Sequence, residues 1–156
     1  MSPQRAKLRR AGADGDHVLI DLRGDPAEGV GSRYRPHRGG YANAAELVGA
    51  LSRAGDFDIS VSAYPEKHPE SPDFATDIEM LKRKVDNGAT RAITQFFFDN
   101  DLYYRYLDRV RAAGITIPIV PGILPVQNFK LAKNFATRAG ATRARRLSPG
   151  PPVRAA

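Results

Sequence analysis

The sequence predicts an α/β protein built on a parallel β-sheet, and three observations support this class. Apolar, strand-like runs alternate four times with segments whose apolar residues recur at helical spacing. Parallel neighbours require a crossover connection, and each helical segment supplies one. The chain has 156 residues, 42% of them hydrophobic and 26% charged, which is enough for one domain with its own core.

The first strand–helix unit begins at residues 17–22, an apolar and partly β-branched run that is followed by a long loop rich in Gly, Pro and Arg. Asn43 is a suitable N-cap for the next helix, and Glu46 three residues later completes a capping box. We expect this helix to end before Gly55, which is predicted to adopt the left-handed conformation that closes helices.

The second unit begins with an alternating strand over residues 57–63 and continues into a loop with two prolines. Ser71 is the predicted N-cap of the following helix, with Pro72 at its first position. Residues 87–88, an Asn-Gly pair, are expected to end it. Four apolar residues of this helix fall on one stripe: Phe74, Ile78, Leu81 and Val85.

The third unit is predicted to have a strand over residues 91–97 and a helix capped by Asp99 or Asn100. Gly114 is expected to terminate this helix. Its inner face is formed by the apolar and aromatic positions Leu102, Tyr103, Tyr106, Leu107 and Val110.

The fourth unit is predicted as a strand over residues 115–120 and a helix over 128–139. Both ends of the chain show neither periodicity, so we expect residues 1–16 and 140–156 to be disordered. One ordered domain over residues 17–139 would remain.

Two architectures fit four consecutive strand–helix units. A doubly wound sheet closes with four or five strands, whereas a (β/α)8 barrel needs eight strands and about 250 residues. Chain length by itself therefore favours the open sheet.

The charge distribution does not indicate a basic groove. The net charge is +7, but residues 17–136 carry 15 basic and 15 acidic side chains, so the excess belongs to the two ends. Nucleic-acid binding through those ends is the weakest hypothesis, because they lack interleaved aromatic residues.

The longest apolar stretch, residues 115–126, is too short for a membrane span and contains three prolines. With no cysteine, the composition fits a cytoplasmic protein that contacts neither nucleic acid nor membrane.

Polar residues follow the predicted strands, where ligands bind in parallel βα folds. Each has an ordinary alternative, such as a surface ion pair or a solvated imidazole, and Gln95 is the least expected because a strand amide needs a hydrogen-bond partner. No metal-binding cluster and no glycine-rich phosphate motif is present in the sequence. The residues at the strand ends are Arg23, Gly24, Asp25, Tyr64, His68 and Gln95.

Three longer blocks, with LRGDP upstream, resemble the flavin-dependent methylenetetrahydrofolate reductases from about residue 22 to residue 136. The blocks are FDISVSAYPEKHPES, DIEMLKRKVDNGATRAITQFFFDND and IPIVPGILPVQNFK. The resemblance implies an oxidoreductase in which NADH or NADPH reduces FAD, which then passes hydride to a folate substrate, 5,10-methylenetetrahydrofolate. It also implies a (β/α)8 barrel, of which this chain would hold four units.

The resemblance also implies roles for individual residues. Asp25 would be catalytic, because a carboxylate near the flavin ring disfavours the anionic reduced flavin and favours a cationic folate iminium. Gln95 would bind the folate substrate. The positions that match family contacts to FAD are Arg23, Gly24, Asp25, Ala44, Tyr64, His68, Asp77, Arg83 and Lys84. For the last three, the ordinary alternative is a solvated helix face.

The sequence departs from the family pattern in ways that leave two hypotheses about function. The general-acid glutamate of the first barrel strand has no counterpart here, and Leu131 replaces a folate-binding amide. The chain is then either a truncated or frame-disrupted reductase, or a non-catalytic flavin- or folate-binding half barrel that acts through assembly with a second copy or with a fuller partner. An open barrel exposes two sheet edges and its inner face, so marginal stability is expected.

Overall fold

The computed structural model describes residues 18–21, Pro36 and residues 38–124. The predicted disordered ends, the predicted helix over 128–139 and the loop with Arg23, Gly24 and Asp25 lie outside these residues. Strands and helices alternate along the described part, as predicted, in the order β1 (Val18–Asp21), α2 (Ala44–Ser52), β2 (Asp58–Ala63), α3 (Phe74–Asp86), β3 (Arg91–Thr94), α4 (Asn100–Ala112) and β4 (Ile119–Val120).

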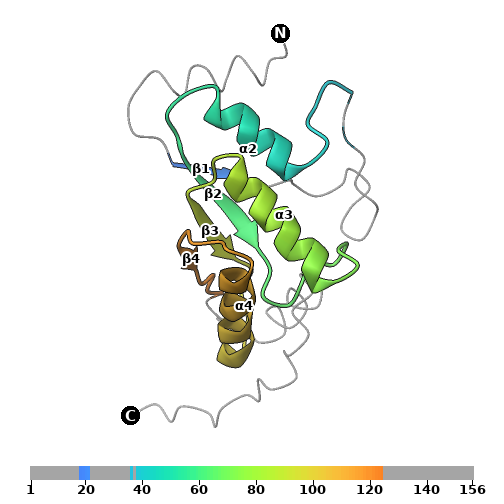
Figure 1. Cartoon of the computed structure of the whole chain (residues 1–156), viewed down its shortest axis with the longest axis vertical. Coiled ribbons are helices and arrows are strands. Elements are labelled where there is room, and N and C mark those ends of the chain that lie inside the picture. Colours follow the sequence, from blue (N-terminus) through green and yellow to red (C-terminus); the bar gives the residue numbers. More distant parts are fainter. Residues whose placement is uncertain (1–17, 22–35, 37, 125–156) are drawn as a thin grey trace, which may run out of the picture.

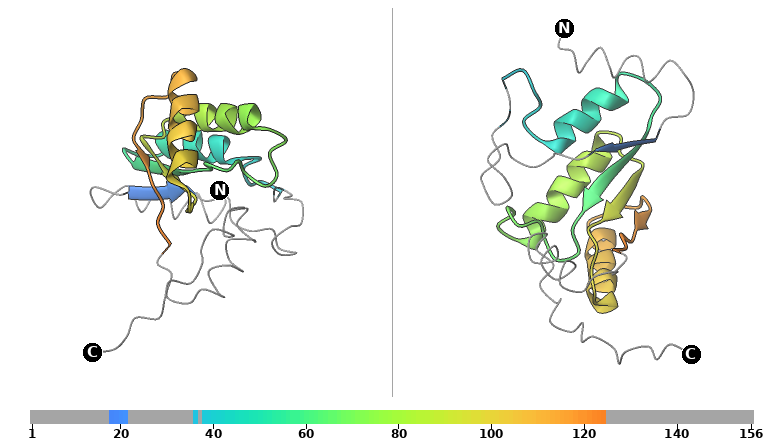
Figure 2. Two further views of the ribbon diagram at one scale, coloured as in Figure 1. Left: turned by 90° about the horizontal axis from the view of Figure 1, so that it is seen from below. Right: turned by 180° about the vertical axis from the view of Figure 1, so that it is seen from behind.

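The four strands form one parallel sheet in the order β1-β2-β3-β4. Ser60 of β2 pairs with Arg91 of β3, and Ala92 of β3 pairs with Ile119 of β4. The three helices lie on the same side of this sheet (Figures 1 and 2). A doubly wound sheet reverses its strand order and carries helices on both faces, so the described strands do not form the sheet that chain length favours.

The core fills the space between the sheet and the helices. In β2, Ile59, Val61 and Ala63 alternate toward the helices and are at most 2% exposed. Burying each large apolar side chain contributes roughly 1.5–3 kcal/mol to folding. The helices contribute the facing residues Val48, Leu51, Ile78, Leu81, Tyr106 and Val110.

The first helix begins as predicted and ends earlier than predicted. Asn43 Oδ1 accepts a hydrogen bond from the Glu46 amide at 3.1 Å, and the Glu46 carboxylate accepts one from the Ala42 amide at 3.0 Å. At the other end the C-cap is Arg53, whose amide donates to a carbonyl of the last turn. The expectation that Gly55 closes α2 was wrong, because the capping bonds form two residues before it.

Helix α3 begins at a different cap from the one predicted. Asp73 is the N-cap, and its carboxylate accepts from the Thr76 amide at 2.7 Å. The prediction of Ser71 as cap and Pro72 as first helical residue was therefore wrong. The Ser71 hydroxyl instead donates to the Asp77 carboxylate at 3.0 Å, an interaction that local sequence spacing does not reveal.

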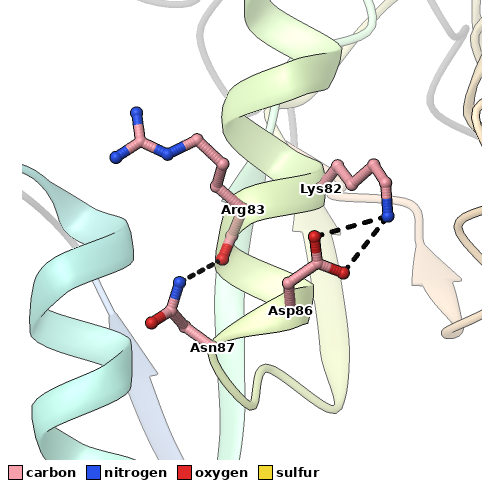
Figure 3. Close-up of polar contacts among 4 residues, drawn as sticks. All are labelled: Lys82, Arg83, Asp86 and Asn87. Carbon is pink, nitrogen blue, oxygen red and sulfur yellow. Dashed lines mark hydrogen bonds and ion pairs between the residues drawn. The ribbon is translucent and has the colours of Figure 1, made fainter.

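The end of α3 confirms the predicted Asn-Gly stop. The Asn87 side-chain amide donates to the Arg83 carbonyl at 2.7 Å (Figure 3). In the same last turn, Lys82 forms an exposed ion pair with Asp86. Gly88 follows with a φ of +114°, a conformation that residues with a β carbon rarely adopt. A glycine is thus required where the chain leaves α3 for β3.

The last two strands are shorter than predicted. β3 ends at Thr94, and the chain then leads to Asp99, which caps α4 as one of the two predicted residues. β4 contains only Ile119 and Val120. The Arg111 guanidinium binds the carbonyls of Ile115 and Ile117 at 2.6 and 3.1 Å, so these residues belong to the turn after α4.

Gly122 allows the ends of β3 and β4 to approach closely. Its amide donates to the Thr94 hydroxyl at 2.9 Å. A β carbon at position 122 would lie 2.1 Å from the Thr94 carbonyl oxygen, so any other residue would force the two segments apart.

Within the described residues, every helix is too short or too polar to cross a membrane.

Candidate functional site

A cavity of about 220 Å3 lies where β2 ends, and we call it the site pocket. It is bounded by the loop after β2 and by residues of α2, α3 and α4. Ligand sites of parallel βα folds occur at this edge of the sheet. The lining residues are Asn43, Ala44, Ser62, Ala63, Tyr64, His68, Glu70, Ser71, Thr76, Asp77, Met80, Leu81, Lys84 and Tyr106.

Lys84 places a cation in the wall of the site pocket. Its side chain is on the core-facing side of α3, and the residue is only 6% exposed. The ammonium donates to the Ser62 carbonyl at 3.0 Å and to the Ser62 hydroxyl at 3.3 Å. These bonds fix the cation at the end of β2, where it can attract an anionic group such as a phosphate.

Asp77 places a carboxylate in the same pocket. It lies in the first turn of α3 and is 9% exposed, and the amide groups at this end of a helix stabilise negative charge. The hydroxyl of Ser71 donates to it at 3.0 Å. A carboxylate held in this way can accept hydrogen bonds from the hydroxyl groups of a ligand.

Two aromatic rings of the loop after β2 border the pocket. The Tyr64 and His68 rings meet edge to face, with centroids 4.7 Å apart and planes at 89°. His68 Nδ1 accepts a hydrogen bond from the Glu70 amide at 3.1 Å. In the neutral imidazole the proton is therefore on Nε2, which makes that atom a donor.

Tyr106 of α4 closes the pocket from the core side and is 1% exposed. Burial raises the pKa of Tyr106 above its ordinary value, the nearby Asp77 carboxylate adds to the rise, and a backbone hydrogen bond from Tyr64 acts in the opposite direction. The phenol is consequently protonated at neutral pH.

Five of the residues that the family resemblance selects lie together in this pocket: Ala44, Tyr64, His68, Asp77 and Lys84. Arg83 does not line it; its side chain is exposed on α3, and its carbonyl accepts the capping bond from Asn87 (Figure 3). Gln95 is outside the pocket, and its side-chain oxygen accepts from the Phe96 amide at 3.2 Å.

Sequence reasoning about function missed Tyr106, Ser71 and Ser62. Tyr106 was assigned to the inner face of its helix for packing alone, although a buried phenol that needs a hydrogen-bond partner was a usable signal. The roles of Ser62 and Ser71 depend on Lys84 and Asp77, which approach them only in the folded chain. In the part of the chain that the structure describes, no three His, Cys, Asp or Glu side chains are grouped as metal ligands.

The fold and the pocket together define a class: α/β proteins with a polar pocket at the carboxyl edge of a parallel sheet. The family model for methylenetetrahydrofolate reductase matches residues 3–146, extending beyond the resembling segment on both sides. The chain therefore belongs to the methylenetetrahydrofolate reductase family.

Curated proteins with this name are similar over most of the chain. A 5,10-methylenetetrahydrofolate reductase of Salmonella typhimurium is 51% identical over 138 residues, covering 85% of this chain and 44% of the relative. The Escherichia coli protein of the same name is 51% identical over 79% of this chain and 39% of its own length. Methylenetetrahydrofolate reductase (NADH) 1 of Zea mays is 39% identical over 129 residues, which cover 76% of this chain and 22% of the maize protein. The chain thus spans less than half the length of these relatives.

Proposed function

We propose that this chain supplies part of the active site of a cytoplasmic, flavin-dependent 5,10-methylenetetrahydrofolate reductase. The reaction would be the NADH- or NADPH-dependent reduction of 5,10-methylenetetrahydrofolate to 5-methyltetrahydrofolate. The observation that carries this proposal is the meeting of Lys84, Asp77, Tyr64 and His68 around one cavity in a member of this family.

The residues of the site pocket fit one portion of FAD. The cation of Lys84 suits a diphosphate, and the Asp77 carboxylate suits ribose hydroxyl groups. The edges and faces of Tyr64 and His68 offer contact area to a flat or sugar-like group. A cavity of about 220 Å3 accommodates a fragment of a dinucleotide, so the flavin ring would lie beyond it. Bound flavin would supply the hydride chemistry, which no side chain of this chain provides.

We assign the ring and folate end of the site to Asp25 and Gln95, together with Arg23 and Gly24. The backbone N–H of Gln95 donates to the Ala63 carbonyl at 2.7 Å. This bond joins residue 95 to the end of β2, directly beside Tyr64. This backbone bond supports placing the Gln95 side chain at the same edge of the sheet as the pocket. The Asp25 carboxylate would stabilise positive charge on the folate as hydride arrives.

We further propose that the domain over residues 17–139 is an incomplete (β/α)8 barrel. The consecutive strand order and the one-sided helices support this arrangement, because both are features of such barrels. The sheet face opposite the helices would be the barrel interior. It carries Ile93, which is half-buried, and Val120, which is 39% exposed.

Flavin spectroscopy on the full 156-residue chain tests the proposed function. We expect the purified protein to bind FAD, seen as a shift of the flavin absorbance and quenching of its fluorescence on titration. Anaerobic NADH or NADPH should then bleach the bound flavin, whereas return of the colour with 5,10-methylenetetrahydrofolate would require the general acid that has no counterpart in this chain.

The outcomes separate the competing functions. Binding without bleaching would support a non-catalytic flavin-binding role and contradict the reductase. Absence of any FAD binding by a folded chain, as judged by circular dichroism, would reject the reductase and the flavin-binding half barrel.

A further inference from the structure

One residue beside the site pocket has an unusual backbone conformation. Lys67 has a φ of 73°, and it is the only residue other than glycine with a positive φ in the described ranges. Side chains with a β carbon disfavour this left-handed region. Something in the loop must therefore hold the chain in this conformation.

The side chain and amide of Lys67 make the bonds that hold it. Its amide donates to the Tyr64 carbonyl at 3.0 Å. Its ammonium donates to the His68 carbonyl at 3.0 Å and also to the Ser71 carbonyl. The half-buried ammonium thus binds two carbonyls of the loop over residues 64–71, and the amide of the same residue binds a third.

The composition of this loop explains why a side chain is needed. Pro65 and Pro69 have no amide hydrogen, so the loop lacks two backbone donors for its own carbonyl groups. The ammonium of Lys67 replaces them, because it has three donors and no acceptor.

We propose that Lys67 is a positioning residue that holds His68 and Ser71 in their places at the site pocket. Lys67 does not line the pocket itself, whereas Tyr64, His68 and Ser71 do. The carbonyl of His68 is fixed by both the Lys67 ammonium and the Ser71 amide, and the Ser71 hydroxyl in turn binds Asp77. The consequence for cofactor binding rests on the proposed function, but the loop geometry does not.

Four variants of the full chain test this role. Lys67→Met removes the ammonium and keeps the apolar stem. Lys67→Gly also removes it but adopts the positive φ without strain, so it separates loss of the ammonium from backbone strain. Lys67→Arg retains a cation and donors. Lys82→Met is the matched control, because Lys82 makes only an exposed ion pair with Asp86 at 3.2 Å, away from the loop (Figure 3).

The first measurement needs no ligand. The amides of Glu70 and Ser71 bind His68 Nδ1 and the His68 carbonyl, so their hydrogen exchange reports the loop, and the 15N shifts of the His68 ring report its tautomer. In Lys67→Met and Lys67→Gly we expect exchange of both amides about tenfold faster or more, and the His68 tautomers should become mixed. Lys67→Arg should restore the original values, and Lys82→Met should not change them.

The second measurement is FAD affinity by fluorescence titration. Loss of a preorganised loop should weaken binding by about tenfold in Lys67→Met and Lys67→Gly, and by much less in Lys67→Arg. Unchanged exchange and an unchanged His68 spectrum in both ammonium-free variants would overturn the proposal, as would an equal loss of affinity in Lys82→Met. If the unaltered chain binds no FAD, the proposed function fails, and the exchange and ring spectra still decide the role of Lys67.

Discussion

The charged side chains at the two ends of the parallel strands differ in their burial. At the amino end, Arg91 pairs with Asp58 at 2.9 Å, the Thr90 hydroxyl binds the same carboxylate, and both side chains of the ion pair are 39% exposed. At the carboxyl end, Lys84 and Asp77 are 6% and 9% exposed and line a cavity. The charged groups at the amino end form an ion pair in contact with water, whereas those at the carboxyl end are buried beside the site pocket.

This difference supports the binding site proposed at the carboxyl end. An exposed ion pair contributes little to stability and is cheap to maintain. A buried charge is costly unless its hydrogen bonds are satisfied, and its retention at a cavity is typical of functional sites. In (β/α)8 barrels functional residues gather at the carboxyl end of the strands, and the buried charges of this chain lie at that end.

The sharpest test of this contrast is Lys84→Met. Loss of a charged hydrogen-bonding group from the pocket should weaken FAD binding by about 1.5–3 kcal/mol, roughly 10- to 150-fold. The free energy of unfolding should also fall, by about 1–3 kcal/mol, because the Ser62 carbonyl and hydroxyl lose the donor that Lys84 supplies. Isothermal titration with FAD and urea unfolding measure the two effects, with Lys82→Met as the exposed-lysine control.

Tyr106→Phe should affect stability more than binding. Loss of the buried hydroxyl is expected to lower the free energy of unfolding by about 1 kcal/mol at neutral pH, measured by urea unfolding. Because the pKa of Tyr106 is raised in the folded state, the unfolded chain loses this proton first as pH rises past about 10. Stability should then fall by up to about 1.4 kcal/mol per pH unit.

The phenylalanine variant should lack this alkaline component of the pH dependence. Parallel slopes for the two proteins between pH 9 and pH 11 would contradict the assignment of the raised pKa to Tyr106.

Asp58→Ala tests the amino end. Removing the exposed partner of Arg91 and Thr90 should lower the free energy of unfolding by about 1 kcal/mol or less. Affinity for FAD should be unchanged, because the cluster is at the end of the sheet away from the site pocket. A loss of affinity comparable to that of Lys84→Met would break the division between the two ends.

The smallest effect is expected at the cap of α3. Hydrogen bonding from the Thr76 amide, and next from its side chain, lowers the pKa of Asp73 below its ordinary value. The carboxylate therefore contributes stability that is fully present above the unfolded pKa of about 3.9. This contribution is lost as pH falls through the lower folded pKa. Asp73→Asn, an uncharged cap, should show a shallower loss of helicity by circular dichroism between pH 4 and pH 2.

The sequence predicted features that depend on neighbouring residues. The alternation of strands and helices, the Asn43–Glu46 capping box and the Gly88 stop follow from local spacing and from the conformational freedom of glycine. The same approach failed at Ser71 and Gly55, because several nearby residues can serve as caps and local spacing does not choose between them. It also predicted strands over residues 91–97 and 115–120 that were too long, because strand length depends on partners distant in sequence.

Residue order alone determined the α/β class, the family resemblance and the residue types that the site needs. Tertiary structure decided the consecutive strand order and the meeting of Tyr64, Asp77, Lys84 and Tyr106 at one pocket. The physical reason is range: periodicity and capping act within a few residues, whereas the pairing of strands and the burial of Lys84 against Ser62 join segments 22 residues or more apart.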